Sequence, residues 1–195
     1  MKDFYDQLYM QNPAVFGDTS SALLDCVFGL IPLEGGTALD LGAGAGHASM
    51  SLASKGFAVT AVDLSDNAFS AISTNSVGSI RTITQNIIDF EMTDDYTVVC
   101  SFFLFHHVER QAAIRLIRRI QDHTVVGGVN IFRMFTQESN FFTSRPKTPN
   151  FYVTDTELVE IYDGWDILID EREASMAAVG GSTNTVQSLV ARRLV

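Results

Sequence analysis

The stretch 37–47 limits the possible folds of this chain more than any other. A short apolar run contains Asp40 near its end, and glycines then occupy every second position, at Gly42, Gly44 and Gly46. A helix-forming segment begins directly afterwards. Glycine allows positive φ angles and close approach of a ligand to the main chain, and the N–H groups at a helix start suit a carboxylate or phosphate. The stretch therefore predicts a strand, a tight turn and a helix N-terminus.

The spacing of these glycines distinguishes two kinds of nucleotide-binding turn. A dinucleotide-binding fingerprint has the pattern G-x-G-x-x-G. Counting from Gly42, its third glycine would stand at position 47, where this chain has His47. The pattern here is G-x-G-x-G, with Asp40 two residues before it. A glycine-rich turn that binds no ligand stays open as the alternative when this stretch is taken alone.

Apolar runs and helical patterns alternate along most of the chain. Strands are predicted at 37–40, 57–62, 79–84, 96–101 and 129–135. Helical patterns between them predict parallel pairing through right-handed crossovers. Two further strands, at 165–169 and 185–190, flank the Gly180-Gly181 turn and predict an antiparallel hairpin. We expect a single α/β domain over residues 1–195, with a mostly parallel seven-stranded sheet and helices on both of its faces.

Two segments lie outside this alternation. Residues 1–17 are rich in aromatic side chains and predict an N-terminal arm, and residues 136–150 are polar, contain Pro146 and Pro149, and predict a loop. Loops of this length are typical of lids or disordered segments. We expect the arm and the loop to cover the site, and the alternatives are an arm that covers an edge of the core and an ordinary surface loop.

Composition excludes several classes of function. The chain has 195 residues, of which 46% are hydrophobic and 18% charged, and its net charge is −10. This charge disfavours nucleic acids and anionic membrane surfaces, because both attract basic patches. No apolar run approaches the roughly 20 residues that span a bilayer. Cys26 and Cys100 lie in apolar stretches, which predicts reduced core residues. We expect a cytoplasmic monomer or homodimer without a metal site, nucleic-acid partner or membrane partner.

Asp63 follows the predicted strand 57–62 directly. An acid at the carboxyl end of this strand can accept hydrogen bonds from both hydroxyls of a ribose, which indicates nucleoside binding by Asp63 without selecting a nucleotide. A helix-capping aspartate is the alternative, although Ser65 already offers a cap. Asp89 and Phe90 follow the next predicted strand, where a carboxylate can accept from the amine of adenine and Phe90 or Ile88 can flank the ring. A turn that merely prefers aspartate is the alternative there.

The run 101–108 reads Ser-Phe-Phe-Leu-Phe-His-His-Val and follows a predicted strand. Ligands of open α/β sheets bind at the carboxyl ends of strands. The aromatic residues can line a cofactor site, and His106 or His107 can orient a substrate or act as a base near neutral pH. The alternative for at least one of them is a histidine whose ring nitrogens find hydrogen-bond partners within the core or at a helix start.

The glycine motif, Asp63, Asp89 and the run 101–108 together resemble class I S-adenosylmethionine-dependent methyltransferases. A closer resemblance is to the tellurite-resistance methyltransferase (TehB-like) family. It rests on 4–9, on the Leu39 to Gly42 motif, on 128–131, on the segment 156–165 and on the terminal 191–193. Members of that family carry a His-Arg pair before the last strand that is thought to serve the substrate. This chain reads Glu-Ala-Ser-Met-Ala at 173–177, so the resemblance implies cofactor binding more firmly than tellurite or selenite chemistry.

The resemblance implies a methyltransferase that uses S-adenosyl-L-methionine and acts on a small-molecule nucleophile, such as a thiol or a chalcogen oxyanion. The alternatives are an S-adenosylmethionine-binding protein without catalysis and a nicotinamide-dependent oxidoreductase. His106 and His107 are the candidate catalytic residues. The candidate cofactor-binding residues are Tyr5, Tyr9, Asp40, Gly42, Ala43, Gly44, Gly46, His47, Asp63, Leu64, Asn86, Asp89, Phe90, Ser101, Phe102 and Phe103.

Overall fold

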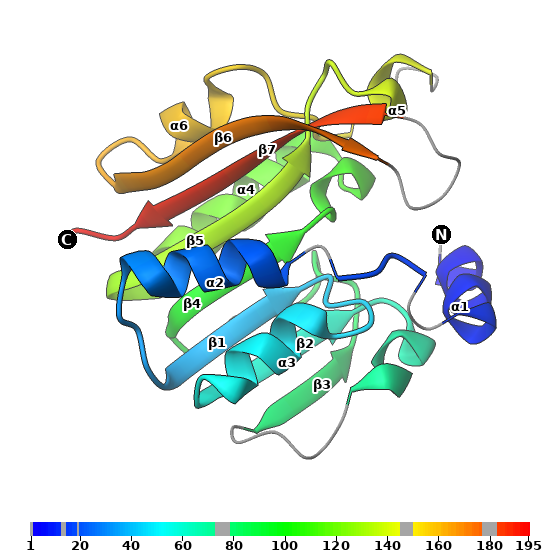
Figure 1. The fold of residues 1–195 in the computed structure, drawn as a ribbon, viewed down its shortest axis with the longest axis horizontal. Coiled ribbons are helices and arrows are strands. Elements are labelled where there is room, and N and C mark those ends of the chain that lie inside the picture. The colour runs from blue at the N-terminus through cyan, green and yellow to red at the C-terminus, as the bar shows by residue number, and fades with distance from the viewer. Residues whose placement is uncertain (1, 13–14, 19, 73–78, 145–149, 177–182) are drawn as a thin grey trace. The chain divides into compact units, whose positions relative to one another are not determined.

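The computed structural model describes residues 2–12, 15–18, 20–72, 79–144, 150–176 and 183–195. The contacts divide the chain into two compact units, Met1–Tyr96 and Thr97–Val195. They are called unit 1 and unit 2, and the expectation of a single domain stays a prediction. The helices and strands of both units are drawn in Figure 1.

Unit 1 contains three parallel strands of a seven-stranded sheet, in the order β3-β2-β1. Its elements are α1 (Lys2–Gln11), α2 (Ser21–Leu30), β1 (Gly36–Leu41), α3 (His47–Ser54), β2 (Phe57–Asp63), the 3₁₀ helix η1 (Asp66–Ala71) and β3 (Ile80–Thr84). The last four residues of β1 are all buried, as is typical of a parallel strand covered on both faces. Helix α3 packs on β1 and β2, and α2 packs on α3 (Figure 1).

Unit 2 contains the other four strands, in the order β4-β5-β7-β6. Its elements are β4 (Tyr96–Phe102), which begins at the boundary, the 3₁₀ helix η2 (Phe105–His107), α4 (Arg110–Asp122), β5 (Thr124–Phe135), α5 (Asn140–Thr143), α6 (Glu157–Ile161), β6 (Asp166–Met176) and β7 (Thr183–Arg192). Strand β7 is antiparallel to both β5 and β6. The antiparallel strands expected at the end of the chain are therefore present, and both are longer than their sequence patterns predicted.

Several local expectations need correction. Cys26 is exposed on α2, whereas Cys100 is buried as expected. Ser65 precedes η1, a 3₁₀ helix, but its hydroxyl makes no cap bond because it donates to Asp6 instead. Helix α2 is capped by Asp18, whose carboxylate accepts from the backbone N–H groups of Ser20 and Ser21 at 3.1 and 2.9 Å. The Ser65 hydroxyl thus bonds to a distant partner where the sequence suggested a local cap, whereas the bonds of Asp18 at the start of α2 are local.

The two segments outside the predicted alternation contain helices. The N-terminal arm forms α1 over Lys2–Gln11. The loop 136–150 contains α5, so it was wrong to expect no regular structure there. This helix begins because Phe141 donates its backbone N–H to Ser139 Oγ and to Asn184 Oδ1, and Asn184 is distant in sequence. Pro146, Pro149, Ala177 and the Gly180-Gly181 turn lie outside the described residues.

Candidate functional site

The glycine turn, residues 42–46, connects β1 to α3 in unit 1. Its three glycines have φ angles of 74°, 52° and 78°, in the left-handed region that strongly favours glycine. The backbone N–H groups of Gly42 and Ala43 both donate to the carbonyl of Val62, at 2.8 and 3.1 Å, which fixes the turn to the end of β2. The predicted strand, turn and helix start are therefore all present, and a bend this tight requires the glycines.

Asp63 ends β2 beside this turn. Its carboxylate accepts hydrogen bonds from the backbone N–H of Gly44 at 2.9 Å and of Ser65 at 3.0 Å. Burial raises the pKa of Asp63, and the N–H groups of Ser65, Gly44 and Leu64 offset part of that rise. The side chain is only half-buried. A half-exposed carboxylate beside a glycine turn is well suited to accept from the hydroxyls of a sugar.

Asp40 has different surroundings. Its carboxylate is 1% exposed and accepts a hydrogen bond from Ser49 Oγ of α3 at 2.6 Å. This bond joins β1 to α3 on either side of the glycine turn. The structure thus gives Asp40 a part in shaping the turn, and its predicted contact with a cofactor stays a prediction.

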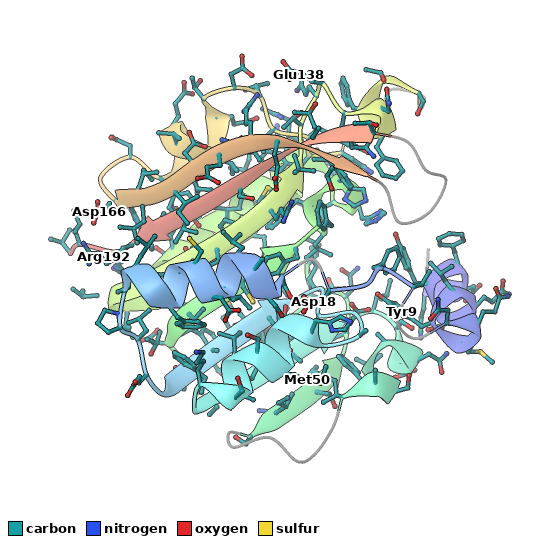
Figure 2. All side chains as sticks on the ribbon, in the orientation of Figure 1. Tyr9, Asp18, Met50, Glu138, Asp166 and Arg192 are labelled. Atoms are coloured by element: carbon teal, nitrogen blue, oxygen red, sulfur yellow. The ribbon has the colours of Figure 1, made fainter. Side chains whose placement is uncertain are left out.

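Two side chains from elsewhere in unit 1 reach the glycines. Tyr9 lies on α1 (Figure 2). Its hydroxyl oxygen lies 2.6 Å from the point that a Cβ on Gly44 would occupy, and the residue is 6% exposed. Ile72 lies 2.4 Å from the corresponding point on Gly46. Burial, followed by the charge of Asp63, raises the pKa of Tyr9. Tyr5, the other predicted tyrosine, is half-buried, and its ring centroid lies 6.4 Å from that of Tyr9.

His47 and Leu64 complete the residues predicted around the turn. His47 is the first residue of α3, and its Nε2 is shielded from solvent without a hydrogen-bond partner among the described residues. Leu64 is half-buried directly after Asp63. The predicted residues from Asp40 to Leu64 therefore lie in the glycine turn and in segments directly bonded to it.

The turn after β3 holds the residues predicted to contact an adenine. Asp89 and Asn86 are exposed, and Asn86 Oδ1 accepts from the backbone N–H of Ile88 at 3.1 Å. Phe90 is buried at 6% exposure, whereas Ile88 is half-buried. Of the two residues expected to flank the ring, Ile88 is therefore the more accessible.

In unit 2, β4 leads into a strained turn. Ser101 is fully buried, and its Oγ has no hydrogen-bond partner within the described parts of the chain. Phe102 ends the strand. Phe103 follows with a φ of 54°, the only positive φ outside glycine in the described ranges. Such strain costs about 1–3 kcal/mol and is often found at functional sites. The predicted cofactor residues of this segment thus occupy an unusual stretch of backbone.

An aromatic cluster surrounds the first histidine of η2. It consists of Phe103, Phe135, Phe141, Phe142, Tyr152 and His106. The His106 ring is 7% exposed, and its centroid lies 4.8 Å from that of Phe135 and 3.7 Å from that of the half-buried His107. His106 is therefore enclosed by rings, while His107 is the more accessible of the two predicted catalytic residues.

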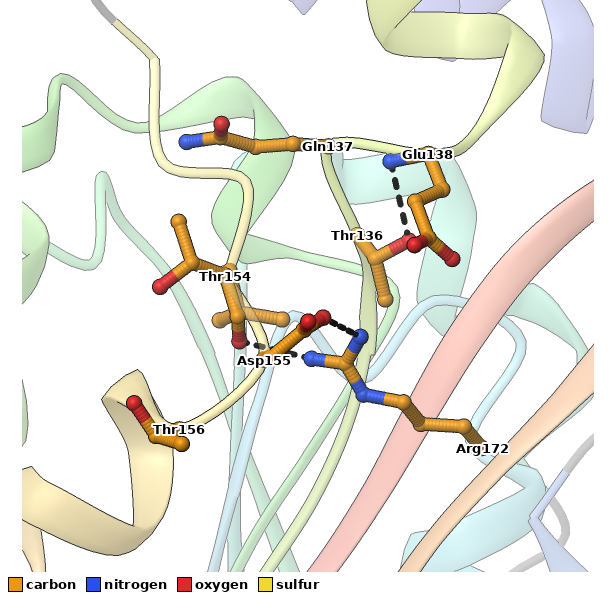
Figure 3. Close-up of a pocket in the computed structure, with 8 residues that line it drawn as sticks. Thr136, Gln137, Glu138, Thr154, Asp155, Thr156 and Arg172 are labelled. Carbon is orange, nitrogen blue, oxygen red and sulfur yellow. Dashed lines mark hydrogen bonds and ion pairs between the residues drawn. The ribbon is translucent and has the colours of Figure 1, made fainter.

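Unit 2 also contains a polar pocket of about 280 Å³ that the sequence did not indicate (Figure 3). It is lined by Thr136, Gln137, Glu138, Val153, Thr154, Asp155, Thr156 and Arg172. Arg172 forms an ion pair with Asp155 and donates to the carbonyl of Thr154 at 2.6 Å. The lining comes from three separate segments, so no local motif could reveal it. Because the Arg172 guanidinium is already bonded to protein groups, the pocket is a weaker candidate for the functional site than the glycine turn.

The described residues contain neither a group of metal-binding side chains nor a helix suited to cross a membrane. No three His, Cys, Asp or Glu side chains there are grouped so as to hold a metal ion. None of the described helices combines the length and apolar character needed to cross a membrane.

Comparison with known sequences identifies relatives. The profile of the family "Tellurite resistance protein TehB" matches residues 2–180. A Haemophilus influenzae (strain 10810) protein described as a probable S-adenosyl-L-methionine-dependent methyltransferase TehB is 25% identical over 170 residues, which are 86% of this chain and 56% of that protein. Hemagglutinin 1 of Eikenella corrodens is 26% identical over 153 residues, 77% of this chain and 49% of that protein. The chain spans about half the length of the curated relatives it matches.

Solved structures share the fold. The crystal structure of TehB from Haemophilus influenzae matches with a TM-score of 0.74 and 22% identity, over 98% of this chain and 66% of that one. Magnesium protoporphyrin IX methyltransferase from Synechocystis PCC 6803, with bound S-adenosylhomocysteine (SAH), matches with a TM-score of 0.72 and 15% identity. The match covers 98% of this chain and 97% of that one. The predicted Rossmann-like class I methyltransferase fold, with its antiparallel C-terminal strands, is confirmed.

Proposed function

The chain belongs to the tellurite resistance protein TehB family, and from this membership we propose that it is an S-adenosyl-L-methionine-dependent methyltransferase acting on a small-molecule nucleophile. The observation that carries the proposal is the glycine turn with Asp63 at its side. The structural similarities support a fold that methyltransferases use, and the curated Haemophilus relative is described as one of them.

The residues of unit 1 fit the cofactor. The three positive-φ glycines carry no side chains of their own, and Tyr9 and Ile72 already pack against Gly44 and Gly46, so a ligand would approach the backbone of the turn beside these two side chains. Asp63 would accept from the ribose hydroxyls, and Asp89 from the adenine amine. Tyr9 would cover the turn from the side of α1. An acidic chain also suits a cationic cofactor, although this contribution is weak.

When bound, S-adenosylmethionine supplies a methyl group on a sulfonium that is already strongly electrophilic. The chain then mainly has to hold the nucleophile in line and exclude water. We propose that Ser101, Phe102 and Phe103 help to bind the cofactor, and that His106 or His107 orients the acceptor or removes its proton. Neutral imidazole can take up a proton near pH 7.

The acceptor class that we propose is a soft nucleophile, namely a thiol or a chalcogen oxyanion. Such a group needs little base catalysis, which agrees with the enclosed position of His106. The segment 173–177, where the family resemblance implies a His-Arg pair, reads Glu-Ala-Ser-Met-Ala here, so an oxyanion would lack that cation. We also propose a cytoplasmic location for the chain, as a monomer or homodimer without a nucleic-acid partner.

Two measurements test the function. Calorimetry with S-adenosylhomocysteine, SAH, should show binding, and a screen with labelled S-adenosylmethionine against small thiols, chalcogen oxyanions and phenols should show methyl transfer to at least one class. Binding without transfer to any acceptor would favour a non-catalytic binding protein. Binding of reduced nicotinamide dinucleotide in place of SAH would favour an oxidoreductase and overturn the proposal.

The histidines are tested by substitution. His107→Ala should lower turnover by about a hundredfold with an acceptor that must lose a proton, and much less with one that is already anionic, with SAH affinity unchanged. The matched variant His123→Ala alters a histidine at the end of α4 and should leave turnover as it is. Equal activity of both variants would remove His107 from the proposed mechanism.

A further inference from the structure

Helix α1 is fixed to the segment that follows Asp63. Asp6 Oδ1 accepts a hydrogen bond from Ser65 Oγ, and the carbonyl of Asp6 accepts from Asn67 Nδ2 at 3.5 Å. Lys2 forms ion pairs with Asp6 at 3.0 Å and with Asp66 at 3.4 Å. Asp6 is therefore the residue of α1 at which most of these bonds meet.

Ser65 bonds in two directions. Its backbone N–H donates to Asp63 Oδ1 at 3.0 Å, and its hydroxyl donates to Asp6. The residue is fully buried, so water does not compete for either bond. A displacement of Asp6 would therefore shift Ser65, whose backbone N–H donates to the carboxylate of Asp63.

Tyr9 lies three residues after Asp6, on the same face of α1. Its hydroxyl lies against Gly44, while Asp6 bonds to the segment after β2. Phe4, on the far side of the helix, and Met10, one turn after Asp6, are 60% and 71% exposed. Helix α1 thus packs on unit 1 by one face only, and the bonds of Asp6 are a large part of what fixes its position.

We propose that Asp6 is a positioning residue for the cofactor, acting through Ser65. This inference rests on the proposed function, since it concerns the same glycine turn and the same carboxylate. The Asp6–Ser65 bond fixes α1 in the position that places Tyr9 over Gly44, and it holds Ser65 so that its N–H orients Asp63. Binding of the cofactor and docking of α1 are then thermodynamically linked, because each stabilises the arrangement that the other needs.

Four variants test this link, with SAH affinity measured by calorimetry. Asp6→Ala and Ser65→Ala each remove one partner of the bond, and each should weaken SAH binding about tenfold. The double variant should be no weaker than either single variant, since both remove the same interaction. Asp6→Asn keeps the Oδ1 acceptor and should stay within about twofold of the wild type.

Hydrogen exchange supplies a readout that a general loss of stability would not reproduce. SAH should slow exchange of the amides in residues 2–11 in the wild type and in Asp6→Asn, but much less in Asp6→Ala. Asp3→Ala is the matched control, because Asp3 is an exposed acid on the same helix, and it should bind SAH as the wild type does. Should Ser65→Ala not fold, the comparison of the Asp6 and Asp3 variants is sufficient by itself.

Several results would overturn the inference. These are equal SAH affinity of Asp6→Ala and Asp3→Ala, affinity of Asp6→Asn as weak as that of Asp6→Ala, or losses that add in the double variant. Weakened binding in Asp6→Ala with unchanged exchange in α1 would also contradict it. A wild-type chain that does not bind SAH would instead refute the proposed function, so the two failures are distinguishable.

Discussion

The glycine turn of unit 1 and the aromatic cluster of unit 2 differ in what builds them. The turn is made of backbone, with three glycines in the left-handed region and N–H groups bonded to Val62 and Asp63. The cluster is made of side chains that come from η2, the end of β5, α5 and Tyr152. Backbone recognition constrains residue types at adjacent positions and leaves a short motif. A side-chain cluster assembled from distant segments leaves none.

This difference predicts separate effects of substitution in the two regions. Changes at the turn should alter cofactor affinity, whereas changes in the interior of unit 2 away from the segment 101–103 should alter stability. The effects are expected to decrease from Gly44→Val through Asp63→Ala and Tyr162→Phe to Asp18→Ala. Each measurement would either support this contrast or contradict it.

The largest effect is expected for Gly44→Val. A β-branched side chain at a φ of 52° costs about 1–3 kcal/mol, and its Cβ would lie 2.6 Å from the Tyr9 hydroxyl. SAH binding should fall below detection by calorimetry. Gly164→Val is the matched control, because Gly164 has a φ of 83° and no atom within 4 Å of its Cβ position. Normal SAH binding by Gly44→Val would place the cofactor elsewhere.

Asp63→Ala should weaken SAH binding by about 1–3 kcal/mol, which is the loss expected when hydrogen bonds to a charged group disappear. Wild-type affinity should also decrease as the pH falls through the pKa of Asp63, which burial raises above its usual value. Calorimetry at several pH values measures both effects. An affinity of the folded variant equal to that of the wild type at neutral pH would exclude Asp63 from the site.

The raised pKa of Asp63 also affects folding, with a definite sign. The folded chain holds this proton more tightly than the unfolded chain, so the Asp63 contribution lowers the free energy of unfolding as the pH rises through the raised pKa. The free energy of unfolding, measured by denaturant titration, should therefore change with pH differently in the wild type and in Asp63→Ala around the raised pKa of Asp63. Parallel pH profiles would contradict this assignment.

A smaller effect, on stability alone, is expected for Tyr162→Phe in unit 2. The Tyr162 hydroxyl donates to Asn130 Oδ1 at 2.8 Å, and Asn130 Nδ2 donates to Thr124 Oγ1 at 2.8 Å, all in the buried interior. Removing the hydroxyl leaves a buried acceptor without this donor, at a cost of about 1–2 kcal/mol in the free energy of unfolding. SAH affinity should not change. A change in affinity would weaken the contrast between the two regions.

The smallest effect is expected for Asp18→Ala, which removes the cap of α2 and should cost about 1 kcal/mol in the free energy of unfolding. Hydrogen bonds from Ser21 and Ser20 lower the pKa of Asp18 to about 2, against the opposing effect of burial. The stabilisation is therefore fully present above the usual aspartate pKa and is lost as the pH falls towards about 2. In denaturant titrations, the free energies of unfolding of the wild type and of Asp18→Ala should differ at pH 6 and approach each other at pH 2.5.

The sequence predicted the parts of the fold whose causes are local. The glycine spacing and the alternation of apolar runs located β1, the turn, α3 and β2, and Asp63 proved to end β2. The resemblance to the TehB-like family was confirmed by the family match over residues 2–180. These features depend on residues close together in the chain, so a local pattern was enough to reveal them.

The features that the sequence missed depend on long-range contacts. The bond between Asp6 and Ser65 joins residues 59 positions apart, and it gives the Ser65 hydroxyl a partner other than the helix it precedes. Helix α5 begins with the help of Asn184, more than 40 positions away. The polar pocket around Arg172 is assembled from three segments. No spacing rule connects such residues, because their proximity follows from the packed structure.

Strand β6 ends the strand order of unit 2, with β7 on one side only. Its sequence carries acidic residues at 166, 170, 171 and 173 against a single basic residue, Arg172, and its register with β7 shifts between Ile167 and Ile169. Charge and irregularity along an edge strand both oppose the addition of a further strand. The acidic composition that suits a cationic cofactor therefore also opposes aggregation through the edge strand β6.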